Sequence, residues 1–215
     1  MKTVNPIQTE TTFFLPARAA LAVGHAITSD KTRYYLGGVY IESETTGLTA
    51  IATDGHLMLW APLPEGAHVG EKVSTQSDDV SRGFILAMDH GDKALRAKGD
   101  LWIYGDAESG IAQVLTRPQD DSPLWPRVGV LEFSRVDGSF PNWRRVRPQA
   151  SPGDSACAPS VDLRHVARLH AAAKVYIGNG VCPALFSTSA PGDPVRVGFS
   201  PTCEGLQGVI VPVRM

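Results

Sequence analysis

Two neighbouring stretches decide the fold: TRYYLGGVYIE (Thr32–Glu42) and LTAIATDGHLML (Leu48–Leu59). Both are rich in β-branched and aromatic residues, which favour strands, and a turn-like Glu44–Gly47 separates them. The runs Tyr34–Ser43 and Leu48–Gly55 are therefore expected to form β-structure.

The same order of strand, helix and further strands is expected three times along the chain. The expected helices are Ala17–Ile27 (after a strand at Thr12–Leu15), Phe84–Gly99 and Val161–Tyr176, the last with Ser160 as its N-cap. The further strands are expected at Leu101–Asp106, Gly110–Arg117, Val128–Val136, Ala184–Ala190, Val195–Ser200 and Gly208–Met215. This order predicts an α+β protein with helices on one face of antiparallel sheets.

One boundary stands out in the composition of the chain. Residues 149–159 are rich in Pro, Ser, Gly and Ala, and such a stretch is typical of a linker. It divides the chain into residues 1–148, expected to hold two of the repeated units, and residues 160–215, expected to hold one.

The composition is that of an ordinary soluble protein. The chain has 215 residues, of which 43% are hydrophobic and 20% charged, a net charge of −2 and a mean hydropathy of −0.07. Binding to nucleic acid would therefore need a local basic face, because salt screens distant charges. The three cysteines form no CxxC pair, which indicates neither a disulfide framework nor a zinc site. With no signal-peptide core and no membrane-length apolar run, a cytoplasmic location is expected.

Three stretches resemble the bacterial DNA sliding clamp, the beta subunit of DNA polymerase III. Thr32–Glu42 leading into Leu48–Leu59 is similar to the start of the clamp's middle domain. DGSFPNWRRVRP (Asp137–Pro148) is similar to the end of that domain, and GVIVPVRM (Gly208–Met215) to the end of the clamp. The resemblance implies a shortened member of the family, built from clamp half-units. By the same resemblance, the chain is expected to lack the family's first domain and to have a last domain reduced to one half-unit.

The resemblance also implies a hydrophobic groove that captures short apolar peptides of polymerases and repair proteins. Its expected wall consists of Leu36, Thr53, Gly55, His56, Met58, Pro141, Val146, Val209, Val211 and Pro212, with Arg33 and Arg145 at the rim and Val213 extending the wall. The family's usual arginine after the DGH sequence is Leu57 here, which is expected to make the groove more apolar.

A DNA-facing surface is implied in the same way. The candidates on helices are Arg18, Lys93, Arg96, Arg164, Arg168 and Lys174, and those on the loop Arg33–Tyr35 are Tyr34 and Tyr35. A few phosphate contacts predict weak, sequence-independent binding that decreases with salt.

Simpler structural explanations exist for several of these residues. Asp54–Gly55–His56 is more typical of a turn than of acid–base catalysis, and five-residue spacing keeps His165 and His170 off one helix face. Arg164 and Arg168 could equally form a solvated helix face, and the tryptophans are expected to be core or interface anchors. No enzymatic activity, metal or cofactor is expected.

The sequence therefore predicts a homo-oligomeric replication or repair accessory protein that binds or encircles duplex DNA and tethers partners through the groove. The alternative is a peptide-binding adaptor or decoy that keeps the groove and does not act on DNA.

Overall fold

Antiparallel strands form a continuous sheet across the molecule. The computed structural model describes residues 2–73, 75–76, 82–147, 160–178, 181–190, 192–199 and 205–212. Within these residues the strands follow the order β12-β13-β14-β5-β4-β3-β8-β11-β10-β9-β2-β6, while β1 pairs with β11 and β7 with β8. Strands from the last part of the chain thus extend the sheet formed by the first part.

The elements have the following bounds. The helical segments are α1 (Ala17–Gly24), α2 (Leu163–Ile177) and the 3-10 helices η1 (Lys31–Leu36), η2 (Lys93–Arg96) and η3 (Trp143–Val146). The strands are β1 (Thr3–Val4), β2 (Thr12–Pro16), β3 (Val39–Glu44), β4 (Gly47–Thr53), β5 (Leu57–Pro62), β6 (His68–Val69), β7 (Thr75–Gln76), β8 (Arg82–Met88), β9 (Leu101–Asp106), β10 (Ile111–Thr116), β11 (Trp125–Val136), β12 (Ala184–Ser187), β13 (Val195–Phe199) and β14 (Gln207–Ile210).

The main core lies between the sheet and three helical segments on one of its faces. Buried residues of α1, η2 and α2 pack in the same cluster as alternate residues of the strands. Strand β5 contributes Leu57, Leu59 and Ala61 to this core, whereas Met58 and Trp60 point to the opposite face. The expected fold class, with helices on one face of antiparallel sheets, is confirmed.

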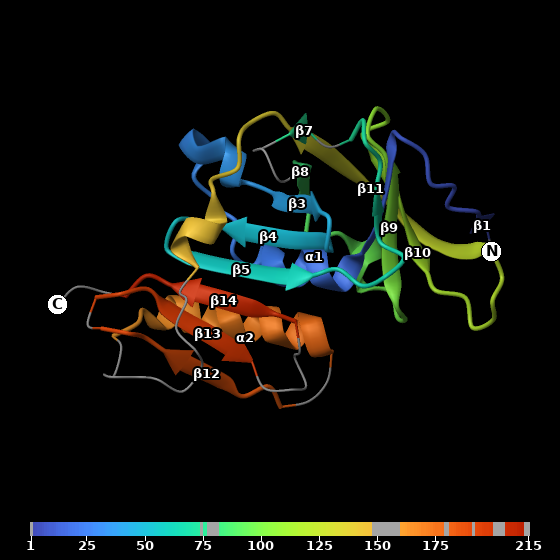
Figure 1. Ribbon diagram of the computed structural model, residues 1–215. Coiled ribbons are helices and arrows are strands. Elements are labelled where there is room, and N and C mark those ends of the chain that lie inside the picture. Colours follow the sequence, from blue (N-terminus) through green and yellow to red (C-terminus); the bar gives the residue numbers. More distant parts are fainter. Residues whose placement is uncertain are drawn as a thin grey trace.

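Strand β11 connects two differently oriented parts of the sheet. Its second half pairs with β8, and its first half pairs with β10. Figure 1 shows β3, β4, β5 and β14 roughly aligned, with β9, β10 and β11 turned away from them. A register shift near Val114 accompanies this change of direction.

The two α-helices lie side by side in opposite directions behind the aligned strands (Figure 1). Arg168, in the first half of α2, donates to the carbonyls of His25 and Ile27 just beyond the end of α1. Through this contact and the pairing of β14 with β5, residues 160–212 join the earlier part of the chain. The division at residues 149–159 stays a prediction, since these residues lie outside the described ranges.

Three expectations for secondary structure were wrong in part. The segment expected as a helix at Phe84–Gly99 instead begins as part of β8, whose apolar residues pair with β3 and β11, and only η2 is helical. The run expected to be extended from Tyr34 begins instead with η1, which Asp30 caps. Helix α1 ends at Gly24 rather than at Ile27.

Helix α2 also differs in its start and in its exposed face. Its N-cap is Asp162, whose carboxylate accepts from the backbone N–H of Arg164, and not Ser160. Leu163 is exposed, because the core contacts of the helix begin further along, at Leu169.

Cys182 is disulfide-bonded, so the expectation of cysteines without a disulfide was wrong. The lack of a CxxC pair does not prevent cysteines far apart in sequence from meeting in a folded chain. In the described part of the chain, no helix has the length and hydropathy to cross a membrane.

A histidine pair lies at the end of α1. The ring of His90 occupies the space where a Cβ at Gly24 would be, within about 2.0 Å of the nearest ring carbon. Both ring nitrogens of His90 are buried and have no hydrogen-bond partner in the described structure. Burial, followed by the nearby His25, lowers the pKa of His90, and burial and then Arg168 lower the pKa of His25.

This pair predicts a loss of stability in mild acid. Unfolded histidines take up protons as the pH falls through about 6.5, while folded His90 and His25 stay neutral to lower pH. The free energy of unfolding should therefore be fully present above about pH 6.5 and decrease as the pH falls through the lowered folded pKa values. Urea denaturation between pH 7.5 and 5.5 should show a smaller loss for His90→Phe than for the wild type. Equal pH dependence in both would contradict this, and the exposed His170→Gln serves as control.

Candidate functional site

The face of the sheet opposite the helices carries a second apolar cluster. We call it the apolar floor, and it consists of Leu36, Tyr40, Ile51, Met58, Trp60, Ile85, Phe140, Trp143 and Val209. The period of two in each strand explains its composition, because Met58 and Trp60 of β5 alternate with Leu57 and Leu59 of the helical core. The sheet thus has two buried apolar faces, one under helices and one under irregular chain.

Segments far apart in sequence meet at this floor. Val209 of β14 is paired with Met58 of β5, and the backbone N–H of Val211 donates to the carbonyl of His56 at 2.8 Å. Trp143 lies over Trp60, with ring centroids 5.7 Å apart, and Tyr35 packs against the cluster. The structure therefore brings the C-terminal strand, the tyrosine segment and the tryptophan–arginine segment together.

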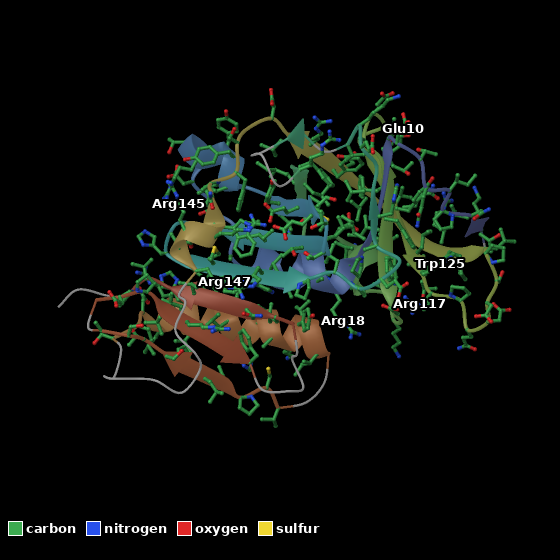
Figure 2. The ribbon with its side chains drawn as sticks, in the orientation of Figure 1. Glu10, Arg18, Arg117, Trp125, Arg145 and Arg147 are labelled. Carbon is green, nitrogen blue, oxygen red and sulfur yellow. The ribbon has the colours of Figure 1, made fainter. Side chains whose placement is uncertain are left out.

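The remaining groove candidates surround the floor. Val146 and Val211 are exposed apolar side chains, at 51% and 44%. Gly55, His56, Pro141 and Arg145 are also exposed, and Arg33, Thr53 and Pro212 are half-buried. Figure 2 shows Arg145 and Arg147 on the side of the molecule where η3 approaches β5 and β14. Val213 lies outside the described residues.

The deepest candidates are less accessible than a groove wall was expected to be. Met58 and Val209 are each only 3% exposed. The rings of Trp60 and Trp143 cover part of the floor, and the guanidinium of Arg147 lies 5.5 Å from the Trp60 ring centroid. A ligand would therefore first meet the exposed side chains of Val146 and Val211.

Leu57 does not face this site. It is fully buried among the residues of the helical core, one position out of phase with Met58. The expectation that Leu57 makes the groove more apolar was wrong, because successive strand residues point to opposite faces of the sheet.

Asp54 of the DGH sequence organises a tight turn. Its carboxylate accepts from the backbone N–H groups of His56 and Leu57, each at 2.8 Å, and pairs with Arg168. Arg33 donates to the Asp54 carbonyl and pairs with Asp30. Burial would raise the pKa of Asp54, but the hydrogen bonds from Leu57 N–H and Arg168 keep this pKa below its usual value. The turn is a structural feature that fixes one border of the site.

A polar cavity of about 640 Å³ opens beside this turn. Its lining residues are Gly24, His25, Ile27, Thr28, Ser29, Asp30, Arg33, Asp54, His56 and Arg168. Both arginines in it are already ion-paired with aspartates. Arg33 and His56, two of the groove candidates, thus line this polar cavity.

The DNA candidates fall into two groups. Arg18, Lys93, Arg96 and Lys174 are exposed side chains on the helical segments that cover the core, and Figure 2 labels Arg18 among them. Arg164 is exposed but paired with Asp162, and this contact lowers the pKa of Asp162 to about 2.

The assignment of Arg168 to the DNA surface stays a prediction. Its half-buried guanidinium is already engaged by Asp54 and by two backbone carbonyls just beyond the end of α1. Tyr34 is exposed, whereas Tyr35 packs at the floor; the two belong to η1 and not to a strand.

Sequence reasoning missed Glu42, a carboxylate buried against the same face of the sheet. It follows Tyr40 by two residues in β3, so the period of two would place it on the floor side. That spacing is the signal that could have found it. Within the described residues, no group of three or more His, Cys, Asp and Glu side chains could hold a metal ion.

The contacts of Arg168 predict a structural role for this residue. Arg168→Met should lower the free energy of unfolding by about 2–3 kcal/mol, because Asp54 and two carbonyls would lose their partner. Arg164→Met, on the same helix but exposed, should leave it nearly unchanged. Urea denaturation at pH 7.5 measures both, and equal stability of the two variants would contradict the assignment.

Comparison with known proteins finds similar sequences among bacterial sliding clamps. The chain is 28% identical over 152 residues to the beta sliding clamp of Escherichia coli K12, which covers 66% of this chain and 35% of that protein. It is 50% identical over 134 residues to the beta sliding clamp of Caulobacter vibrioides, covering 58% of this chain and 30% of the relative. No family model matches the chain.

Solved structures support the same fold. The sliding clamp of Pseudomonas aeruginosa aligns with a TM-score of 0.60 at 14% identity, over 95% of this chain and 67% of that one. The clamp of Bartonella birtlesii, solved bound to griselimycin, aligns with a TM-score of 0.58 at 18% identity, over 100% of this chain and 69% of that one. At these identities the likeness shows the fold alone. The sequence match and the fold agree: the chain is similar to bacterial DNA sliding clamps, and it spans about a third of the length of the curated relatives that it matches.

Proposed function

We propose that this protein is a clamp-like accessory factor of DNA replication or repair, which tethers partner proteins through the apolar floor and its rim. The observation that carries the proposal is the pairing of Val209 with Met58 beside the Trp143 segment. Buried apolar residues there are bordered by exposed Val146 and Val211 and by the polar groups of Arg33 and His56. Such a surface gains affinity from apolar area and direction from its polar border.

Ligands of solved relatives are consistent with this proposal. The Bartonella birtlesii clamp is bound to griselimycin, and a Caulobacter crescentus clamp carries polyethylene glycol at the region assigned to beta-motif tethering. Bound partners would be held near DNA at high effective concentration, a role that requires no chemical step.

We further propose that the helical face contacts duplex DNA. Arg18, Lys93, Arg96 and Lys174 are exposed on segments that share this face, and exposed Arg164 and Tyr34 are secondary candidates. With Arg168 committed to Asp54, few phosphate contacts are available, so binding would be weak and independent of sequence.

The same commitment of Arg168 favours a second candidate function. An adaptor or decoy would capture clamp-binding peptides without acting on DNA. The net charge of −2 and the pairing of Arg164 with Asp162 are consistent with it.

Self-association is proposed from the edge of the sheet. Strand β12 ends the strand order and carries Leu185, which is exposed, and exposed Val181 lies close to it in sequence. A strand at the end of a sheet with exposed apolar side chains favours pairing with another chain. We expect a homo-oligomer in light scattering coupled to size exclusion, and the mass of a single chain would rule it out.

The peptide site is tested most cleanly at its rim. Met58→Asp or Val209→Asp would bury a charge and disturb the fold, because both side chains are only 3% exposed. Val146→Asp and Val211→Asp introduce the charge at exposed positions instead. Each should weaken griselimycin binding at least about tenfold in isothermal titration calorimetry, because the charge must be desolvated on binding.

The matched control for these variants is Val130→Asp, on β11, where the wild-type valine is similarly exposed at 48%. It should bind griselimycin as the wild type does. Unchanged affinity in both rim variants would remove the site assignment.

Duplex binding is tested by a salt titration. Filter binding to a duplex of about 20 base pairs should show an affinity that falls steeply with salt, and Arg18→Ala with Lys174→Ala should reduce the slope by about one to two. Lys72→Ala, which removes an exposed cation paired with Glu10, should leave the slope unchanged. If the wild type has no affinity for the duplex even at low salt, the adaptor function is favoured.

A further inference from the structure

Strand β3 carries a buried carboxylate on the floor side of the sheet. Glu42 is 2% exposed. The other buried polar residues of the described chain are uncharged, namely Thr12, Ser187 and Thr188. An ionised carboxylate in such a position is costly unless it is paired and hydrogen-bonded. The segment that supplies the partners of Glu42 therefore indicates the role of this buried charge.

All of the hydrogen bonds described for this carboxylate come from one distant segment. Trp143 Nε1 donates to Glu42 Oε2 at 3.0 Å. Arg144 donates with Nη1 to Oε1 at 3.0 Å and with Nη2 to Oε2 at 2.7 Å, and it also pairs with Glu44. A bidentate guanidinium and an indole N–H fix both the distance and the orientation of the donor segment.

The segment carrying these donors leads directly to the rim of the site. Arg145 and Val146 follow Arg144 in η3. The segment has a second anchor at Phe140, whose ring stacks on Tyr40 at 4.7 Å with an interplanar angle of 9°. Phe140 on one side of Pro141 and the contacts with Glu42 on the other side hold the segment in place. The positions of Arg145 and Val146 therefore depend on Glu42.

An apolar side chain would pack this face without the cost of a buried charge. Replacing buried ion pairs with apolar residues is often neutral or stabilising, so stability alone does not explain a carboxylate here. A carboxylate instead favours a single position of the segment that carries Trp143 and Arg144. In any other position of this segment, the buried charge of Glu42 would have no partner.

We propose that Glu42 is a positioning residue for the apolar site, holding the segment Trp143–Val146 so that Arg145 and Val146 stand at its rim. The effect on ligand binding rests on the proposed function. The effect on the segment itself does not.

The experiment compares the wild type with Glu42→Met and Glu42→Gln. Hydrogen exchange followed by mass spectrometry reports on residues 137–147, and calorimetry reports on griselimycin binding. Glu42→Met should speed exchange in this segment while the rest of the chain keeps its protection, and should weaken binding about tenfold. Glu42→Gln keeps a hydrogen-bond acceptor and should restore both properties to within about threefold of the wild type.

The matched control is Glu10→Gln, which removes an exposed pair with Lys72 and should change neither measurement. Trp143→Phe removes a single donor and keeps the aromatic ring, so it supplies the test if Glu42→Met does not fold. It should raise exchange in the same segment.

The outcomes separate the two proposals. Wild-type exchange and wild-type affinity in Glu42→Met would overturn the positioning role. Equal losses in Glu42→Met and Glu42→Gln throughout the chain would also overturn it, because they indicate a general effect on stability. If the wild type itself does not bind griselimycin, the proposed function fails, and exchange in residues 137–147 then decides the role of Glu42 by itself.

Discussion

The pairing of β14 with β5 is the interaction on which the rest of the structure depends. It brings the last described strand next to Leu57–Pro62 and so attaches β12 and β13 to the sheet formed by the first part of the chain. Because β5 has apolar residues at every position from Leu57 to Ala61, it can bury both of its faces. One face closes the core beneath α1 and α2, and the other supplies the apolar floor.

The polar contacts of the site border this apolar arrangement and hold its edges. Asp54 binds the backbone of its own turn and the guanidinium of Arg168, and so connects the end of β4 to both helices. On the opposite border, Glu42 holds Trp143 and Arg144. Carboxylates with fixed partners thus set the two sides of a surface whose affinity would come from apolar side chains. In both cases the ion pair orients chain segments rather than meeting a ligand.

Much of the architecture could be predicted from the sequence, because alternating apolar residues mark strands such as β9, β10 and β13. The convergence of three separate stretches followed from the family resemblance and not from periodicity. Phe84–Gly99 was misread because a short apolar run fits a strand and a helix equally well, and only its pairing with β3 and β11 decides.

The assignment of single side chains was less predictable, for physical reasons. Leu57 and Met58 are adjacent and both apolar, so the sequence does not say which one faces the site; the register of β5 decides it. Arg168 looks like a surface cation until Asp54 and two helix-end carbonyls are seen around it. Glu42 was overlooked because a charge in a strand is usually solvated, and its partners are about a hundred residues away.

Methyl NMR of the methionines tests the central claim directly. With the methionine methyl groups labelled, griselimycin should shift the resonance of Met58, which lies in the apolar floor, and leave that of Met88 unchanged, since Met88 packs against the helical core. Assignment through Met58→Leu and Met88→Leu makes the comparison unambiguous. A saturating amount of griselimycin that leaves Met58 unperturbed, or that shifts Met88 instead, would contradict the account.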